Sequence, residues 1–220
     1  MGPGSRLPPE RQLAERYAVS RPLMREVLRT LTERGLIESS PGRGTFVREA
    51  RLPDAARSLD AIYRRQRLTP RAVFQARLTL ERDTAYLAAS HATDEDLSAI
   101  EAALDEFDAS RDVLAQARAD IRFHAAVARA GHNPVLEIMF GSIAGLTHEL
   151  MLRSLSDPLV SREGVPYHRE VLEAIKARSP QVARRAMAGH LQVGPRTYGT
   201  DLDESLDVVA RRKLEELLGE

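Results

Sequence analysis

The sequence contains no cysteine and no tryptophan, and aromatic residues make up only 5% of its 220 residues. Without cysteine, the chain has neither a disulfide framework nor thiolate metal ligands. No apolar run approaches the length of a membrane span, and no signal-like segment opens the chain. We therefore predict a cytoplasmic protein whose core is built from aliphatic residues within a hydrophobic share of 43%.

The chain also lacks an excess of either charge, because 32 basic and 32 acidic residues balance to zero. This argues against a protein that coats nucleic acid indiscriminately. The charge is unevenly spread, however: residues 1–50 carry nine arginines and six acidic residues, a net +3, and the remainder carries −3. A modestly basic N-terminal region on an acidic body favours a regulated DNA binder. The length allows one small and one medium domain.

Residues 7–47 predict a short helix, a tight turn, a second helix and a two-stranded hairpin. The first helix is expected at about residues 9–17, because Pro9 lacks the amide hydrogen that has no partner at a helix start. Its apolar stripe consists of Leu13, Ala14 and Tyr17.

The second helix is expected to run from Ser20, which can cap it, to about residue 34, before a left-handed Gly35. Proline is tolerated in the first turn, where Pro22 lies. Val19 is expected to fill the space between the helices. The expected buried residues of the second helix are Val27, Leu28 and Leu31.

Arg21, Arg25 and Arg29 are spaced four apart and therefore share one face of the second helix. Arg21 and Arg25 lie near the helix start, the end that enters the major groove in helix-turn-helix proteins. Two short strands at residues 36–39 and 45–47 place Arg43 at a hairpin tip, within reach of a minor groove or a phosphate. One amphipathic arginine helix alone would more often be a solvated surface helix, but the whole array predicts a winged helix-turn-helix.

These motifs resemble the winged helix-turn-helix of GntR-family transcription regulators. They are LPPERQLA at 7–14, VSRPLMREVL at 19–28, GLI at 35–37 and GRGTFV at 42–47. The resemblance implies DNA contacts by Arg11, Ser20, Arg21, Arg25, Gly42 and Arg43. Pro22 and Leu23 stand where the family often has threonines, which removes two possible hydroxyl contacts to DNA.

After a predicted linker and short helix at residues 51–66, the chain is expected to be helical almost throughout. Helix starts are marked by Thr69-Pro70, Thr93, Asn133-Pro134 and Ser179-Pro180. The expected helices span about residues 70–91, 94–109, 111–131, 134–155, 162–178, 180–192 and 202–218. The predicted fold is mostly α, with a winged helix-turn-helix at 1–50 and an antiparallel helical bundle at 67–220.

Four polar residues are expected to point into the bundle from three helices: Asp120, His124, His168 and His190. Each shares a stripe with apolar residues, and burial without partners would be costly. Asp120 and His124 are one turn apart and can bind one ion. Neutral imidazoles with a carboxylate suit zinc, nickel, manganese or iron. A hydrogen-bonded polar core without metal is the alternative.

Further motifs resemble the ligand-binding FCD domain of the FadR-type branch of the GntR family. They are RLTLE at 77–81, ATDEDL at 92–97, DIRFH at 120–124 and GHNP at 131–134. The resemblance implies a divalent metal held by Asp120, His124, His168 and His190, with a small organic acid completing its coordination. Arg77 would be the second clamp on that effector, because guanidinium pairs with carboxylate. A salt bridge to Glu81 is the alternative for Arg77, and Asn133 either contacts the effector or caps the next helix.

We therefore expect a transcription regulator, a repressor that binds double-stranded operator DNA as a homodimer and senses a small carboxylate. We do not expect an enzyme, because four protein ligands leave little room on the metal and no separate general base stands out. The alternatives are a metal-dependent, hydrolase-like enzyme and a DNA-binding protein with a purely structural polar core.

Overall fold

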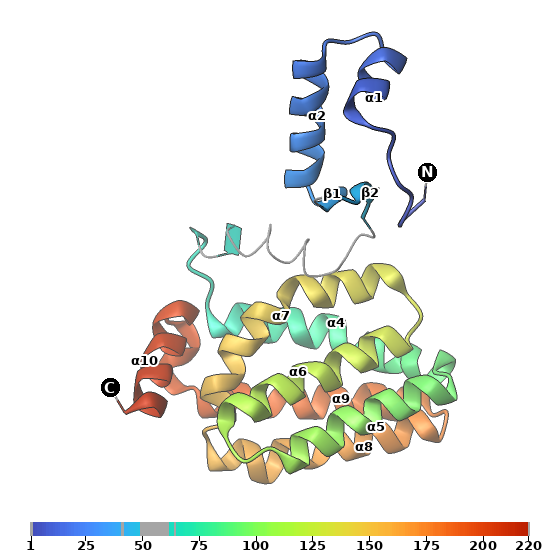
Figure 1. The fold of residues 1–220 in the computed structure, drawn as a ribbon. Coiled ribbons are helices and arrows are strands. Elements are labelled where there is room, and N and C mark those ends of the chain that lie inside the picture. Colours follow the sequence, from blue (N-terminus) through green and yellow to red (C-terminus); the bar gives the residue numbers. More distant parts are fainter. Residues whose placement is uncertain (1, 41, 49–61, 64, 220) are drawn as a thin grey trace. The chain divides into compact units, whose positions relative to one another are not determined.

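The structure is a computed structural model that describes residues 2–40, 42–48, 62–63 and 65–219 (Figure 1). The chain divides into two compact units, Met1–Asp54 and Ala55–Glu220. The linker and short helix predicted at residues 51–66 lie largely outside the described residues.

The first unit is a winged helix-turn-helix. Its elements are α1 (Glu10–Arg16), α2 (Arg21–Glu33), β1 (Ile37–Ser40) and β2 (Gly44–Val47). The two strands pair antiparallel. The extended segment at residues 4–7 lies along the other side of β2, where the Gly4 amide donates to the Val47 carbonyl and the Leu7 amide to the Thr45 carbonyl, both at 2.8 Å. The wing therefore has an N-terminal third segment.

The predicted cap and stop of the second helix are both present. The Ser20 hydroxyl accepts a hydrogen bond from the Leu23 amide at 3.3 Å and so caps α2. Gly35 has φ +71°, the left-handed conformation that favours glycine.

The core of this unit differs in part from the predicted one. Its buried residues are Leu13, Ala14 and Met24, with Val19 and Leu28 packed against them. Two predictions are wrong: Val27 is 42% exposed and Tyr17 is 62% exposed. Met24 and Leu28 lie one turn apart on the side of α2 that meets α1, and Val27 is rotated away from Leu28 by about 100°.

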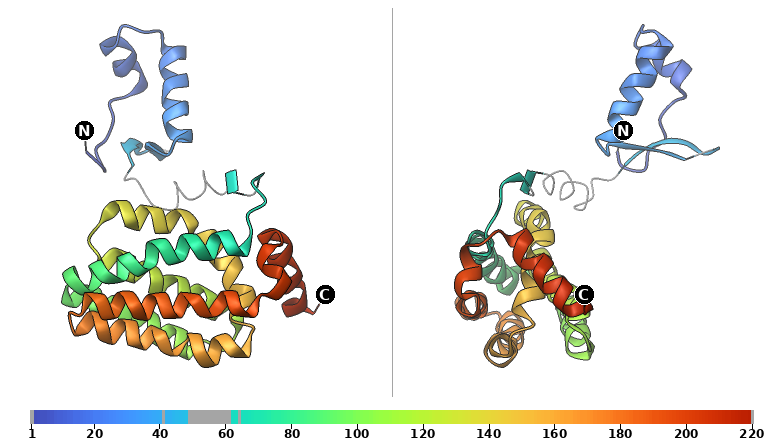
Figure 2. Two further views of the ribbon diagram at one scale, coloured as in Figure 1. Left: turned by 180° about the vertical axis from the view of Figure 1, so that it is seen from behind. Right: turned by 90° about the vertical axis from the view of Figure 1, so that its left-hand side faces the viewer.

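Described residues of the second unit form a helical bundle whose helices appear in Figures 1 and 2. They are α4 (Pro70–His91), α5 (Asp94–Ala109), α6 (Val113–Ala130), α7 (Pro134–Ser154), α8 (Pro166–Lys176), α9 (Pro180–Val193) and α10 (Leu206–Leu218). Capping side chains explain several starts. Thr69 caps α4, a Thr93–Asp96 capping box opens α5, and Asn133 caps α7.

Two helix boundaries differ from prediction. The helix expected at 162–178 is divided into a π-helix, η1 (Val160–Gly164), and α8, because Pro166 cannot donate a backbone hydrogen bond. The helix expected at 202–218 begins only at Leu206. Two short 3₁₀ helices precede it, η2 (Gly194–Thr197) and η3 (Gly199–Asp203), with Pro195 near the start of η2.

The bundle has two apolar clusters. One surrounds Phe123 and joins α4, α5, α6, α8 and α9; the other surrounds Leu150 and includes residues of α4, α6, α7 and α10. Asp120 lies on α6 between Ala117, which belongs to the second cluster, and Phe123, which belongs to the first. The polar residues predicted from the sequence therefore occupy the junction of the two clusters.

One described helix, α7, is long and apolar enough to cross a membrane by length and composition, with a mean hydropathy of 1.3. This stretch is not an uninterrupted apolar run, because it contains Glu137 and Glu149. In the structure α7 packs against α4, α6 and α10 as part of the bundle.

Candidate metal centre and DNA-reading surface

Four side chains that could hold a metal ion meet inside the bundle. Asp120 and His124 lie one turn apart on α6, His168 lies on α8 and His190 on α9. One potential ligand atom from each residue lies within 4.8 Å of the others. The structure thus brings together all four residues that were predicted as metal ligands.

The histidines turn the same ring atom toward the centre of this group. The Nε2 atoms of His124 and His190 are 3.2 Å apart. His168 Nε2 lies 3.2 Å from one carboxylate oxygen of Asp120, and His124 Nε2 lies 3.8 Å from the other. Three imidazole nitrogens and one carboxylate therefore converge on one small volume.

Several of these atoms are buried without a hydrogen-bond partner. Asp120, His124 and His168 are each 1% exposed, and His190 is partly buried. Among the described residues, both carboxylate oxygens of Asp120 and both ring nitrogens of His168 lack a hydrogen bond. His168 Nε2 lies 3.2 Å from Asp120 Oδ1, but the two groups are not aligned as a hydrogen bond. Unpaired burial is costly. A cation would satisfy the Asp120 oxygens and the Nε2 atom of His168, so the residues fit a metal ion.

The ionisation states also fit a cation. Burial opposes ionisation of Asp120, but His124, His168 and Arg77 hold its pKa well below the usual range. Burial also opposes ionisation of Glu81, yet Arg77 and His124 lower its pKa to about 2.

Burial lowers the pKa of His168, and it lowers that of His190 well below the ordinary value. Anionic carboxylates and neutral imidazoles are the forms that bind metal. In the metal-binding form, in which the imidazoles are neutral, Arg77, Asp120 and Glu81 sum to a net charge of −1, which a divalent cation would offset.

Arg77 is buried beside this group and is paired with Glu81. Its Nε donates to Glu81 Oε1 at 2.6 Å, and its Nη2 donates to Oε2 at 3.4 Å. Its Nη1 meets only a weak acceptor, the sulfur of Met151, at 3.7 Å. The salt bridge considered from the sequence is therefore present, and Nη1 is the part of Arg77 without an oxygen partner in these contacts.

Thr147 of α7 shares a helix face with two residues that contact the polar group. It lies seven residues from Phe140, whose ring stacks with His124, and four from Met151, which contacts Arg77. These spacings place the three residues on one face of the helix. Thr147 is fully buried, and its hydroxyl has no hydrogen-bond partner in the part of the chain that the structure describes.

Asn133 is not part of this arrangement. Its side-chain oxygen accepts hydrogen bonds from the amides of Val135 and Leu136 at 3.1 and 3.3 Å. It also lines a separate hollow with His91 and His132. The structure therefore gives Asn133 the capping role rather than a place beside the four candidate ligands.

The arginines of α2 differ in their surroundings. Arg25 donates through Nε and Nη2 to Glu10 on α1, both at 3.1 Å, and Arg21 lies 3.8 Å from the same carboxylate. Both side chains are more than 60% exposed. Arg29 is instead held between Glu26 and Glu33 of its own helix, at 2.5 Å from each. Arg21 and Arg25 are therefore paired with a carboxylate of another helix, whereas Arg29 is paired within α2.

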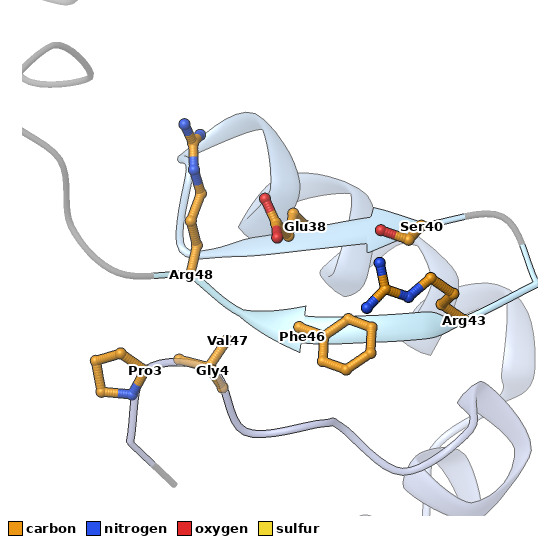
Figure 3. Close-up of a pocket in the computed structure, with 8 residues that line it drawn as sticks. All are labelled: Pro3, Gly4, Glu38, Ser40, Arg43, Phe46, Val47 and Arg48. Atoms are coloured by element: carbon orange, nitrogen blue, oxygen red, sulfur yellow. The ribbon is translucent and has the colours of Figure 1, made fainter.

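The other predicted DNA contacts lie on the surface of the same unit. Arg11 is exposed on α1 and pairs with Glu15 at 3.3 Å. Gly42 and Arg43 are exposed in the hairpin turn, where Gly42 has φ +73°. Figure 3 shows Arg43 and Phe46 bordering a hollow on the wing, which Arg48 also lines.

Comparison with known proteins assigns both units to one family. Residues 1–47 match the family described as "Bacterial regulatory proteins, gntR family", and residues 72–193 match the "FCD domain". The chain belongs to the GntR family. As a GntR-family regulator that carries an FCD domain, it is a DNA-binding transcription regulator and not an enzyme.

Relatives of this regulator share most of its length. The "HTH-type transcriptional regulator LutR" of Bacillus subtilis is 31% identical, covering 86% of this chain and 89% of the relative. The "Galactonate operon transcriptional repressor" of Escherichia coli is 33% identical, covering 84% and 83%. The solved structure of "Streptococcus agalactiae GntR" has a TM-score of 0.68 at 25% identity and covers 89% of this chain and 91% of its own.

Sequence reasoning missed several neighbours of the predicted residues in this GntR-family chain. Glu81 was considered only as a partner of Arg77, and its contact with His124 joins two different helices. The Gly164 carbonyl, which lies 3.0 Å from His190 Nδ1, and the carboxylate of Glu10 beside Arg25 were not considered. Only the Arg77–Glu81 spacing carried a local signal, because residues four apart meet on a helix.

Proposed function

We propose that this GntR-family regulator is a repressor that senses a small carboxylic acid through a metal-containing pocket in its FCD domain. The observation that carries the proposal is the convergence of Asp120, His124, His168 and His190, with ligand atoms within 4.8 Å and both Asp120 oxygens unpaired. The repressor assignment draws on the related galactonate operon repressor.

The four residues would hold a divalent ion, for which zinc, nickel and manganese are the best matches to nitrogen and carboxylate donors. When bound, the metal supplies a positive Lewis-acid centre for a carboxylate oxygen. The protein contributes His124, His168 and Arg77, which keep Asp120 ionised against the opposing effect of burial. Its buried surroundings strengthen the electrostatic interactions.

Arg77 would provide the second contact for the acid. Its Nη1 has only the Met151 sulfur as a partner among the hydrogen bonds of that group, so a carboxylate oxygen would be a stronger acceptor there. The unpaired hydroxyl of Thr147 offers a further polar contact on the same side. This arrangement supports a small polar effector.

On DNA, the regulator would act as a homodimer in the cytoplasm, with one α2 helix in each half-site. Arg21, Arg25 and Arg43 would contact bases or phosphates, together with Arg11, Ser20 and Gly42. The acid controls DNA binding only if it favours one arrangement of the two units over another. A coupling of about 1–3 kcal/mol corresponds to a 5- to 150-fold change in operator affinity.

A thermal-shift screen of small carboxylic acids, galactonate included, tests the effector and the metal together. An acid at 100 times its Kd should add about 2.7 kcal/mol to the free energy of unfolding. We expect the shift to disappear after chelation and in Asp120→Asn. A shift that survives chelation would remove the metal from the proposal. If no acid shifts the melting temperature and the protein takes up no metal, Asp120 and the three histidines are a structural polar core.

Fluorescence anisotropy on operator DNA tests the direction of control. We expect an acid that stabilises the protein to weaken operator binding. Tighter operator binding in the presence of the acid would contradict the proposal that the acid releases the repressor from DNA.

A further inference from the structure

Each imidazole that binds a metal through one nitrogen has a second nitrogen facing outward, and these outer nitrogens have different partners here. His190 Nδ1 lies 3.0 Å from the Gly164 carbonyl at the end of the π-helix η1. His124 Nδ1 lies 2.5 Å from Oε2 of Glu81, a close contact that is not aligned as a hydrogen bond. His168 Nδ1 has no hydrogen-bond partner among the described residues. Within the described parts of the chain, His124 is therefore the one histidine of the three with an outer carboxylate.

Glu81 serves two groups at once. It is 1% exposed on α4 and accepts hydrogen bonds from Arg77 at 2.6 and 3.4 Å, while the same Oε2 contacts His124 on α6. A single buried carboxylate thus links a candidate metal ligand with the candidate effector clamp.

We propose that Glu81 is the positioning residue that orients His124 for the metal and couples metal binding to Arg77. The inference rests on the proposed function, because it assumes that His124 is a metal ligand. A carboxylate at Nδ1 favours the tautomer that carries its hydrogen there, which leaves the Nε2 lone pair directed at Asp120, His168 and His190. Such outer partners contribute about 10- to 100-fold to metal affinity.

The coupling follows from the shared oxygen. A metal held at Nε2 would make the Nδ1 hydrogen of His124 more positive and strengthen its attraction for Glu81 Oε2. The 3.4 Å bond from Arg77 Nη2 ends on the same oxygen and is the longer of its two bonds to Glu81. A bound metal would therefore weaken that bond and free the Nη2 donor of Arg77 for an incoming carboxylate. By linkage, the acid must raise metal affinity by the same factor.

Zn²⁺ affinity, measured by competition with a chromophoric chelator, tests this role without an identified effector. Glu81→Gln keeps the size of the side chain but removes its charge, and we expect Zn²⁺ binding to weaken about 10- to 100-fold. Arg77→Met removes the competitor for Glu81, and we expect Zn²⁺ to bind more tightly than to the wild type. An unchanged Zn²⁺ affinity in this variant would contradict the coupling to Arg77. A purely structural ion pair would instead make both variants bind more weakly.

The double variant Glu81→Gln/Arg77→Met removes the ion pair without leaving a buried charge and serves if Glu81→Gln does not fold. We expect it to bind Zn²⁺ as weakly as Glu81→Gln. Absorption spectra of bound Co²⁺ add a signature of ligand geometry, which should change with Glu81 and not with Arg77. Wild-type affinity and spectrum in the double variant would overturn the role of Glu81 alone. A wild-type protein that binds no metal would overturn the proposed metal centre, and with it this inference.

Discussion

The hydroxyl of Thr147 makes a sharp prediction at the scale of one residue. It is fully buried without a partner, so its desolvation is not offset. Valine has the same shape without the hydroxyl. We expect Thr147→Val to raise the free energy of unfolding of the ligand-free protein by about 1 kcal/mol, measured by urea denaturation.

Thr84 provides a matched control on α4. It is equally buried, but its hydroxyl donates to the Glu81 carbonyl at 2.9 Å. Thr84→Val should therefore lower stability or leave it unchanged, because a satisfied hydrogen bond is lost. Equal changes in the free energy of unfolding for the two substitutions would show that burial of the Thr147 hydroxyl does not destabilise the protein.

Residues differ in how far the sequence could predict their surroundings. Asp120 and His124 could be paired from the sequence, because a four-residue spacing places them on one helical face. The contact of His124 with Glu81 could not, since it depends on how α4 packs against α6. The exposure of Val27 could not be predicted either, because it depends on which side of α2 meets α1.

At the scale of one element, the arginines of α2 should not be equivalent. Arg25 is exposed and has one external partner, Glu10, whereas Arg29 is held by two carboxylates of its own helix. We expect Arg25→Ala to lower the ratio of operator to random-DNA affinity by about tenfold or more, because an arginine fork discriminates bases. Anisotropy titrations on both DNAs measure this ratio.

Arg29→Ala is the control, since it removes the same charge from the same helix. It should change the ratio little. A uniform loss on operator and random DNA in Arg25→Ala would instead identify Arg25 as a phosphate contact.

Helix boundaries were predictable where a side chain caps the backbone. Thr69 and Thr93 define the starts of α4 and α5, and both helices have the predicted bounds. The prediction of one continuous helix at 162–178 was wrong, because the apolar pattern of the sequence does not reveal the π-helix before Pro166. The π-helix places the Gly164 carbonyl beside His190, so the segment that departs from the predicted helix lies next to the candidate site.

At the scale of the whole bundle, the buried histidines should make stability depend on pH. His168 and His190 have pKa values lowered from 6.5 by burial, so the unfolded chain binds protons that the folded chain does not. The free energy of unfolding therefore falls as pH drops below about 6.5, with a slope approaching about 1.4 kcal/mol per pH unit for each histidine.

Urea titrations between pH 7.5 and 5.5, with a chelator present throughout, isolate this effect. The carboxylates contribute mainly at lower pH, because their ordinary pKa values are 3.8 and 4.5 and the folded values of Asp120 and Glu81 are lower still. In His168→Gln/His190→Gln the slope in this window should be markedly smaller. An unchanged slope would mean that the two imidazoles accept protons inside the fold, and a centre that accepts protons so readily would hold a metal ion poorly at neutral pH.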